Sequence, residues 1–133
     1  MDKVLIVGDN PEFLDILKEG LQKYKGQFEV LTASGGEKAI EVLKREHVSV
    51  LVTDFVKPKV DGPELLSHMT KDHPTTPCIV MTEHVSPKIE TRADRKDAFR
   101  YVRKPFDCNE LARAIIEGLD CLDEGNLFRQ GHW

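Results

Sequence analysis

The chain has 133 residues, of which 40% are hydrophobic and 32% charged, and its formal net charge is -4. This length and balance predict one globular domain with a single core. The negative charge argues against binding to nucleic acid, which depends on clustered Lys and Arg. No apolar run approaches the roughly 18 residues of a membrane span, and the first residues read as a strand, not as a signal peptide. We therefore expect a cytoplasmic protein with no direct nucleic-acid or membrane partner.

Five short apolar segments alternate with segments of helical periodicity. The strand candidates cover residues 4–7, 28–31, 48–52, 78–81 and 99–102. The first, third and fourth are continuously apolar, which is typical of strands covered by helices on both faces, so we expect these three in the middle of a sheet. The regular alternation predicts an α/β fold: a doubly wound five-stranded parallel sheet with helices on both faces.

Start signals and apolar stripes predict the helices. Asn10 followed by Pro11 predicts the N-cap and first residue of the first helix. Capping-box spacing predicts three later starts, at the pairs Ser34 and Glu37, Asp61 and Glu64, and Asp107 and Glu110. The apolar stripes are Phe13, Leu14, Leu17 and Leu21 in the first helix, and Leu111, Ala114, Ile115, Leu119 and Leu122 in the last. Residues 86–96 have few apolar positions and predict a short, weakly held helix.

Four of the predicted strands are followed by residues with polar side chains. These residues are Asp9 after Gly8, then Asp54, then Thr82 and Glu83, and then Lys104, which Pro105 follows. The carboxyl ends of parallel strands meet at one edge of the sheet, where such folds bind their ligands. Carboxylates beside open water positions suit Mg²⁺, and a lysine opposite them can neutralise a phosphoryl group. The sequence therefore predicts a metal and phosphate site at this edge.

Four segments carry a family resemblance in their order and spacing. They are VLIVGDNPEFL at 4–14, VLVTDFVKPKVDGPELL at 50–66, VMT at 80–82 and AFRYVRKPF at 98–106. Together they resemble the receiver domains of bacterial response regulators, the phosphorylated proteins of two-component signal transduction. The resemblance covers about residues 2–122. It implies a flavodoxin-like strand order of 2-1-3-4-5, a receiver domain over residues 1–122 and a C-terminal tail over 123–133.

The resemblance also implies the chemistry of the site. Asp54 would accept a phosphoryl group from the phosphohistidine of a sensor histidine kinase or phosphotransfer protein. Asp9, Asp54 and the backbone carbonyl of Val56 would bind Mg²⁺, the one cofactor implied. Lys104 would pair with the phosphate, and Thr82 would donate a hydrogen bond to it. The protein would not be an enzyme in the ordinary sense, although slow autodephosphorylation is compatible with these roles.

Two further features follow from the resemblance. Tyr101 would change rotamer as residues 83–97 rearrange, and this surface would bind an output protein or domain. Receivers often dimerise near the same surface, so a homodimer stays open as a partner. The Lys104-Pro105 bond resembles the cis peptide of the family.

The sequence departs from the family pattern at Gly8, Glu83, Val56 and Lys57, and the first three bear on the chemistry of the site. Gly8 stands where receivers usually have the first of two adjacent acids, so one carboxylate of the metal cluster is missing. Glu83 replaces a small residue and would either obstruct the phosphoryl group or swing in as a compensating acid. Val56 replaces a residue that is often polar, and an apolar side chain cannot position an attacking water. We therefore expect phosphate on Asp54 to be held for a long time.

Two other functions remain open at this point. Gly8 and Glu83 are compatible with a degenerate receiver, which would bind its partner in a phosphorylation-independent way. A flavodoxin-like flavoprotein or a phosphohydrolase is the alternative from another class. However, residues 8–13 read GDNPEF and not a hydroxyl- and glycine-rich phosphate loop, and Val56 stands where acid-nucleophile phosphatases commonly have a second Asp.

Overall fold

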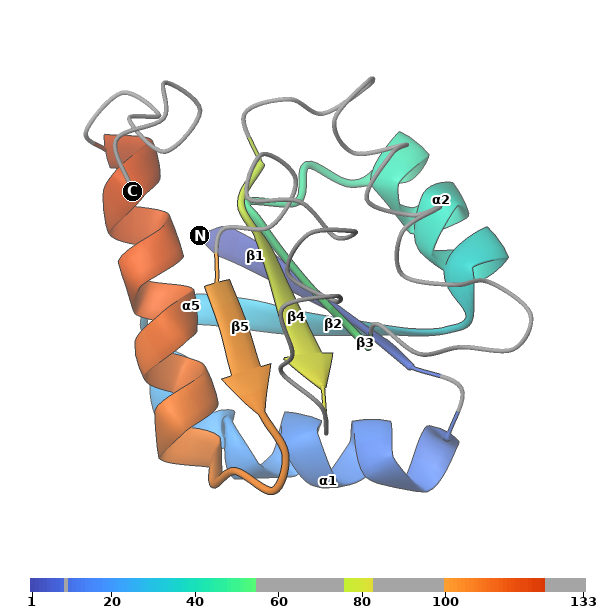
Figure 1. Cartoon of the computed structure of the whole chain (residues 1–133). Coiled ribbons are helices and arrows are strands. Elements are labelled where there is room, and N and C mark those ends of the chain that lie inside the picture. Colours follow the sequence, from blue (N-terminus) through green and yellow to red (C-terminus); the bar gives the residue numbers. More distant parts are fainter. Residues whose placement is uncertain (9, 55–75, 83–99, 124–133) are drawn as a thin grey trace.

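The computed structural model describes residues 1–8, 10–54, 76–82 and 100–123 (Figure 1). Its elements in chain order are β1 (Asp2–Gly8), α1 (Pro11–Gly20), the short 3-10 helix η1 (Gln22–Tyr24), β2 (Phe28–Ser34), α2 (Gly36–Arg45), β3 (Val50–Asp54), β4 (Cys78–Thr82), β5 (Arg100–Arg103) and α5 (Cys108–Asp123). All five strands that the sequence predicts are present, and their first and last residues differ from the predicted ones by at most three positions. The predicted helix over 86–96 and the predicted helix start at Asp61 and Glu64 lie outside the described residues.

The strands form one parallel sheet in the order β2-β1-β3-β4-β5. This confirms the doubly wound α/β fold and the predicted strand order. It also confirms that the three continuously apolar segments, now β1, β3 and β4, occupy the middle of the sheet. In Figure 1 the arrowheads of β4 and β5 point the same way, as the parallel pairing requires.

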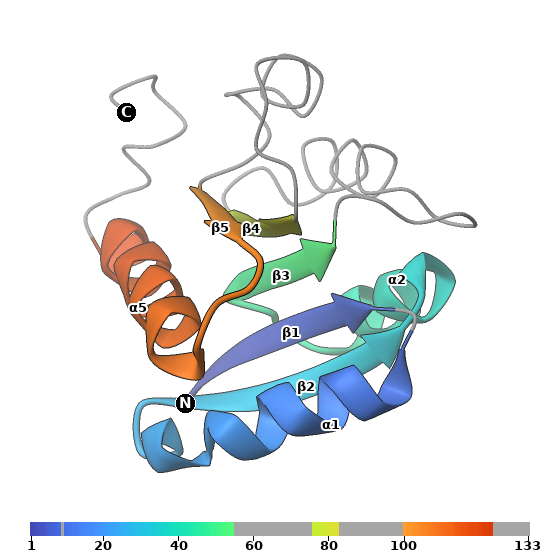
Figure 2. The ribbon, with the colours of Figure 1, turned by 60° about the horizontal axis from the view of Figure 1, so that its bottom comes forward.

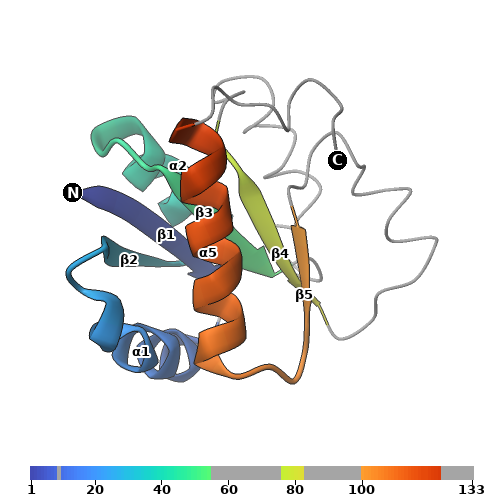
Figure 3. The same ribbon diagram turned by 90° about the vertical axis from the view of Figure 1, so that its left-hand side faces the viewer.

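The helices cover both faces of the sheet, and a separate apolar cluster fills each side. Val4 and Ile6 of β1 join α1 and α5 in the first cluster. Leu5 and Val7 of the same strand join α2 in the second. Figure 3 shows α5 in front of the sheet with α2 behind it, and Figure 2 shows α1 running beside β1 and β2. Because successive side chains of a strand point to opposite faces, burial on both faces accounts for the unbroken apolar runs.

Two of the predicted helix starts are confirmed. The Asn10 side chain accepts hydrogen bonds from the backbone N–H groups of Glu12 and Phe13, at 3.0 and 3.3 Å. Asp107 accepts from the backbone N–H of Glu110 at 2.8 Å, just ahead of α5. Each carboxamide or carboxylate satisfies donors that have no partner inside the helix.

The capping box predicted from Ser34 and Glu37 is wrong. Strand β2 continues through Ser34, and α2 begins after Gly35, which has a φ of 113° and serves as the N-cap. The Ser34 hydroxyl accepts from the Lys38 ammonium at 3.1 Å. A glycine tolerates this left-handed conformation, so the chain turns from strand to helix one residue later than the spacing predicts.

The end of α1 and the following 3-10 helix η1 meet α5 at a close seam. The Tyr24 hydroxyl donates to Asn109 Oδ1 at 3.0 Å. Nearby, Gly20 lies so close to Cys108 that a Cβ on the glycine would come within 2.3 Å of the cysteine Sγ. The seam therefore requires a residue without a side chain at position 20.

Within the described part of the chain, no helix is both long and apolar enough to cross a bilayer.

Replacing Gly20 with alanine should therefore destabilise the protein although alanine is the better helix former. We expect the free energy of unfolding to fall by about 1 to 3 kcal/mol, the usual cost of overpacking, measured by urea denaturation. Adding Cys108→Ala should restore part of the loss, because it removes the sulfur but keeps a Cβ that lies 3.2 Å away. Gly26→Ala is the control, since a Cβ there meets no atom within 4 Å. Equal losses in the free energy of unfolding at Gly20 and Gly26 would contradict tight packing of Gly20 against Cys108.

Candidate functional site

The strand register brings several predicted site residues to one edge of the sheet. Asp54 ends β3 and pairs with Met81 of β4. Thr82 ends β4 and pairs with Arg103, and Lys104 comes one residue later. Gly8 ends β1, whose Val7 pairs with Thr53. The strands are parallel, so all these ends lie at the carboxyl edge, the position where doubly wound sheets bind ligands.

The other predicted residues are placed differently or lie outside the described part. Tyr101 is within β5, paired with Val80, and so lies before the edge. Asp9, Val56 and Glu83 lie outside the described residues. Accordingly, the described residues contain no group of three His, Cys, Asp or Glu side chains that could hold a metal ion. The donor types proposed for the ion, two carboxylates and a backbone carbonyl, are the oxygen ligands that Mg²⁺ prefers.

Gly8, the position of the missing acid, lies against helix α1. The glycine is buried, and a Cβ added to it would lie 3.2 Å from Leu14 Cδ2 and 3.7 Å from Leu14 Cγ. Leu14 is itself buried in the cluster between the sheet and α1. Position 8 is therefore packed tightly against an apolar side chain, and a side chain at Gly8 requires Leu14 to shift by a few tenths of an ångström.

Lys104 is positioned over an aromatic ring of α1. Its ammonium lies 5.0 Å from the centroid of the Phe13 ring, within the roughly 6 Å range of a cation–π contact. The bond between Lys104 and Pro105 is cis, as the resemblance implies. The sequence identified Phe13 only as part of an apolar stripe. The ring lies 91 positions earlier in the chain than the lysine, a separation over which periodicity carries no signal.

A largely apolar groove of about 620 Å³ runs beside this lysine. It is lined by Phe13, Ile16 and Leu17 of α1, by Lys104, Pro105, Phe106 and Asp107 of the connection between β5 and α5, and by Cys108, the first residue of α5. Ile16 is 63% exposed, so part of the apolar lining of the groove is open to solvent. Lys104 lines the groove and follows β5 at the carboxyl edge of the sheet. The groove therefore adjoins the edge at which Asp54 and Thr82 end their strands.

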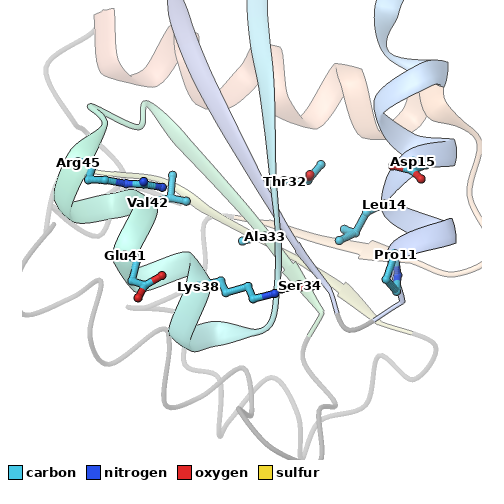
Figure 4. A pocket seen from close by; sticks show the side chains of 10 residues that line it. All are labelled: Pro11, Leu14, Asp15, Thr32, Ala33, Ser34, Lys38, Glu41, Val42 and Arg45. Carbon is cyan, nitrogen blue, oxygen red and sulfur yellow. Dashed lines mark hydrogen bonds between the residues drawn. The ribbon is translucent and has the colours of Figure 1, made fainter.

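A second pocket, of about 420 Å³, lies between α1, β2 and α2 (Figure 4). Side chains of both charges line it: Lys38 and Arg45 with Asp15 and Glu41. Figure 4 shows Lys38 reaching toward Ser34, its hydrogen-bond partner. No predicted site residue contributes to this pocket, so we do not assign it to the candidate site.

Sequence comparison relates the chain to response regulators. Residues 4–116 match the family described as the response regulator receiver domain. The transcriptional regulatory protein GlrR of Escherichia coli (strain K12) is 32% identical over 117 residues, which are 88% of this chain and 26% of GlrR. The chain thus spans about a quarter of the length of this relative.

Solved structures agree with the family and the fold. The CheY-like response regulator receiver domain protein of Methanospirillum hungatei JF-1 has a TM-score of 0.84 and 26% identity, covering 93% of this chain and 98% of that protein. TrrA of Thermotoga maritima, crystallised in complex with Mg(2+)-BeF, has a TM-score of 0.77 and 26% identity over 90% of this chain and all of its own. With its parallel sheet, its acid and lysine at the carboxyl edge and a family match over residues 4–116, the chain belongs to the response regulator receiver domain family of two-component systems.

Proposed function

We propose that this receiver accepts a phosphoryl group on Asp54 and in response switches a surface that binds an output partner. The observation that carries the proposal is the convergence of Asp54, Thr82 and Lys104 at the carboxyl edge of the sheet. A carboxylate can attack phosphorus, while a hydroxyl donor and an ammonium can stabilise the charge of the transferred group. The chemistry is a single covalent modification of the receiver, so the protein is a phosphoacceptor more than a turnover enzyme.

Each residue then has a defined role. Asp54 forms the aspartyl phosphate, Thr82 donates a hydrogen bond to a phosphoryl oxygen, and Lys104 pairs with another oxygen as a point charge. Asp9, Asp54 and the Val56 carbonyl would hold Mg²⁺, which supplies charge neutralisation on the phosphoryl group. Crystallisation of the structural neighbour TrrA with Mg(2+)-BeF supports this choice of cofactor.

The proposed donor is a sensor histidine kinase or a phosphotransfer protein. The apolar groove beside Lys104, with the exposed Ile16, supports docking of such a protein next to the acceptor. Tyr101 on β5 would change rotamer and report phosphorylation to an output domain or protein, or to a second copy of the chain. We propose a cytoplasmic receiver domain over residues 1–122, followed by a tail over 123–133.

Intact-mass spectrometry after incubation with acetyl phosphate and Mg²⁺ tests the proposal. The native protein should gain one phosphoryl group, and the gain should depend on Mg²⁺. No gain at any Mg²⁺ concentration would favour the second candidate, a degenerate receiver that binds its partner without phosphorylation. Gly8 is the observation behind that candidate, because the buried glycine removes one acid from the pocket.

Restoring the acid at Gly8 should tighten Mg²⁺ binding. In Gly8→Asp the Mg²⁺ concentration that half-saturates phosphorylation should fall by about tenfold, the size of effect expected for one residue of a metal site. Gly8→Ala is the matched control, because its Cβ presses on Leu14 in the same way without adding a carboxylate. If the two variants have the same Mg²⁺ dependence, position 8 contributes only packing.

Val56 should make the aspartyl phosphate long-lived. An apolar side chain at this position cannot orient a water molecule for attack on phosphorus, so we expect slow loss of phosphate. Introducing a polar side chain, as in Val56→Asn, should accelerate the loss by about tenfold. This is less than the roughly hundredfold or more of a positioned general base, because an amide orients a water molecule without accepting its proton. Loss of labelled phosphate from the purified protein measures the rate. A wild-type protein that loses its label as fast as Val56→Asn would overturn this prediction.

A further inference from the structure

We infer that the Phe13 ring helps to hold the Lys104 ammonium in the unphosphorylated state and that this contact competes with the phosphoryl group for the ammonium. Phe13 is thus a positioning residue that acts through Lys104. The inference rests on the proposed phosphorylation of Asp54, and it extends that proposal to a residue of helix α1. It starts from the 5.0 Å separation between the ammonium and the ring centroid.

The ring is held firmly enough to serve as a fixed partner. Phe13 is half-buried and packs against the cluster between the sheet and helices α1 and α5. It lies in the first turn of α1, where its backbone N–H donates to the Asn10 cap at 3.3 Å. Lys104 is likewise half-buried, and it lines the same groove. The contact therefore lies between two partly desolvated groups at the edge of the sheet that carries Asp54.

The strength of this contact suits a reversible resting position. A cation over an aromatic face is attracted more weakly than an ammonium hydrogen-bonded to a charged phosphoryl oxygen. The first turn of a helix also carries the positive end of the helix dipole, which favours an anion over an ammonium. A phosphoryl group on Asp54 should therefore draw Lys104 away from Phe13, and removal of the ring should make that transfer easier.

Beryllofluoride, which mimics a bound phosphoryl group, provides the test with Mg²⁺ and the full chain. We expect Phe13→Leu to bind it about two- to fivefold more tightly than the wild type, the equilibrium effect of a cation–π contact at the weaker end of its range. Phe13→Tyr, which keeps an aromatic face, should retain the wild-type affinity. Tyr24→Leu is the control for general loosening: it removes a ring near the end of α1 that lies 5.6 Å from the Lys23 ammonium and 5.9 Å from Phe28. Its beryllofluoride affinity should equal that of the wild type.

Nuclear magnetic resonance gives a readout that a purely structural role would not change. The ε-methylene protons of Lys104 should be shifted upfield by the ring in the wild type and in Phe13→Tyr. They should lose this shift in Phe13→Leu and on addition of beryllofluoride to the wild type. Unshifted Lys104 protons in the wild type, or beryllofluoride binding that is unchanged or weaker in Phe13→Leu, would overturn the inference.

The failure of the proposed function has a different signature. If the wild type and every variant bind no beryllofluoride at any Mg²⁺ concentration, the proposed function fails and the competition fails with it. If the wild type binds it and Phe13→Leu binds it equally well, only the competition is overturned.

Discussion

A protein in which Asp54 is replaced by asparagine should gain no phosphoryl group from acetyl phosphate under conditions that fully modify the wild type. Asparagine keeps the size of the side chain, but its neutral amide is a poor nucleophile and a weaker ligand for Mg²⁺. Asp54 ends β3 at the edge of the sheet that Thr82 and Lys104 also reach, and this placement makes it the expected acceptor. Intact-mass spectrometry should show complete loss of the modification, the largest functional effect that we predict.

The matched control is Asp120→Asn, which makes the same chemical change on an exposed residue of α5. This variant should gain one phosphoryl group as the wild type does. Retention of the modification in Asp54→Asn would show that another residue is the acceptor. Loss of it in both variants would indicate that an altered fold or net charge, and not the missing nucleophile, prevents the reaction.

Replacing Ile115 with alanine should cause the largest loss of stability. Ile115 has no exposed surface and belongs to the apolar cluster through which α5 packs on the sheet. Truncation of a buried isoleucine removes favourable transfer energy and leaves a cavity, so the free energy of unfolding should fall by about 2 to 5 kcal/mol. Urea denaturation monitored by circular dichroism measures this change. The slope of the free energy of unfolding against urea concentration should stay the same, as expected when only stability changes.

Ile16→Ala is the control for this prediction, because it makes the same substitution within a helix at a residue that is 63% exposed. Its free energy of unfolding should change by no more than about 0.5 kcal/mol, as is usual at the surface. Similar losses in the two variants would mean that Ile115 is not part of a packed core. A small loss in both would mean that α5 contributes little to the stability of the domain.

Local sequence patterns predicted the fold correctly. The unbroken apolar runs of β1, β3 and β4 placed these strands in the middle of the sheet, because a strand buried on both faces needs apolar residues at consecutive positions. Asn10 and Asp107 marked true helix starts, since a short polar side chain before a helix satisfies donors only a few residues away. The carboxyl edge also followed from the sequence, because parallel strands bring their ends together.

Only the tertiary structure decided the contacts between residues far apart in the chain. These contacts are the Lys104 ammonium over the Phe13 ring, the close approach of Gly20 and Cys108, and the packing of Leu14 against Gly8. The structure also shows that Ser34 is not the N-cap of α2, because strand β2 extends to that residue and Gly35 makes the turn. Periodicity and capping express forces that act within a few residues of the chain. A contact between α1 and the residue after β5 depends instead on how whole elements pack, which no local pattern encodes.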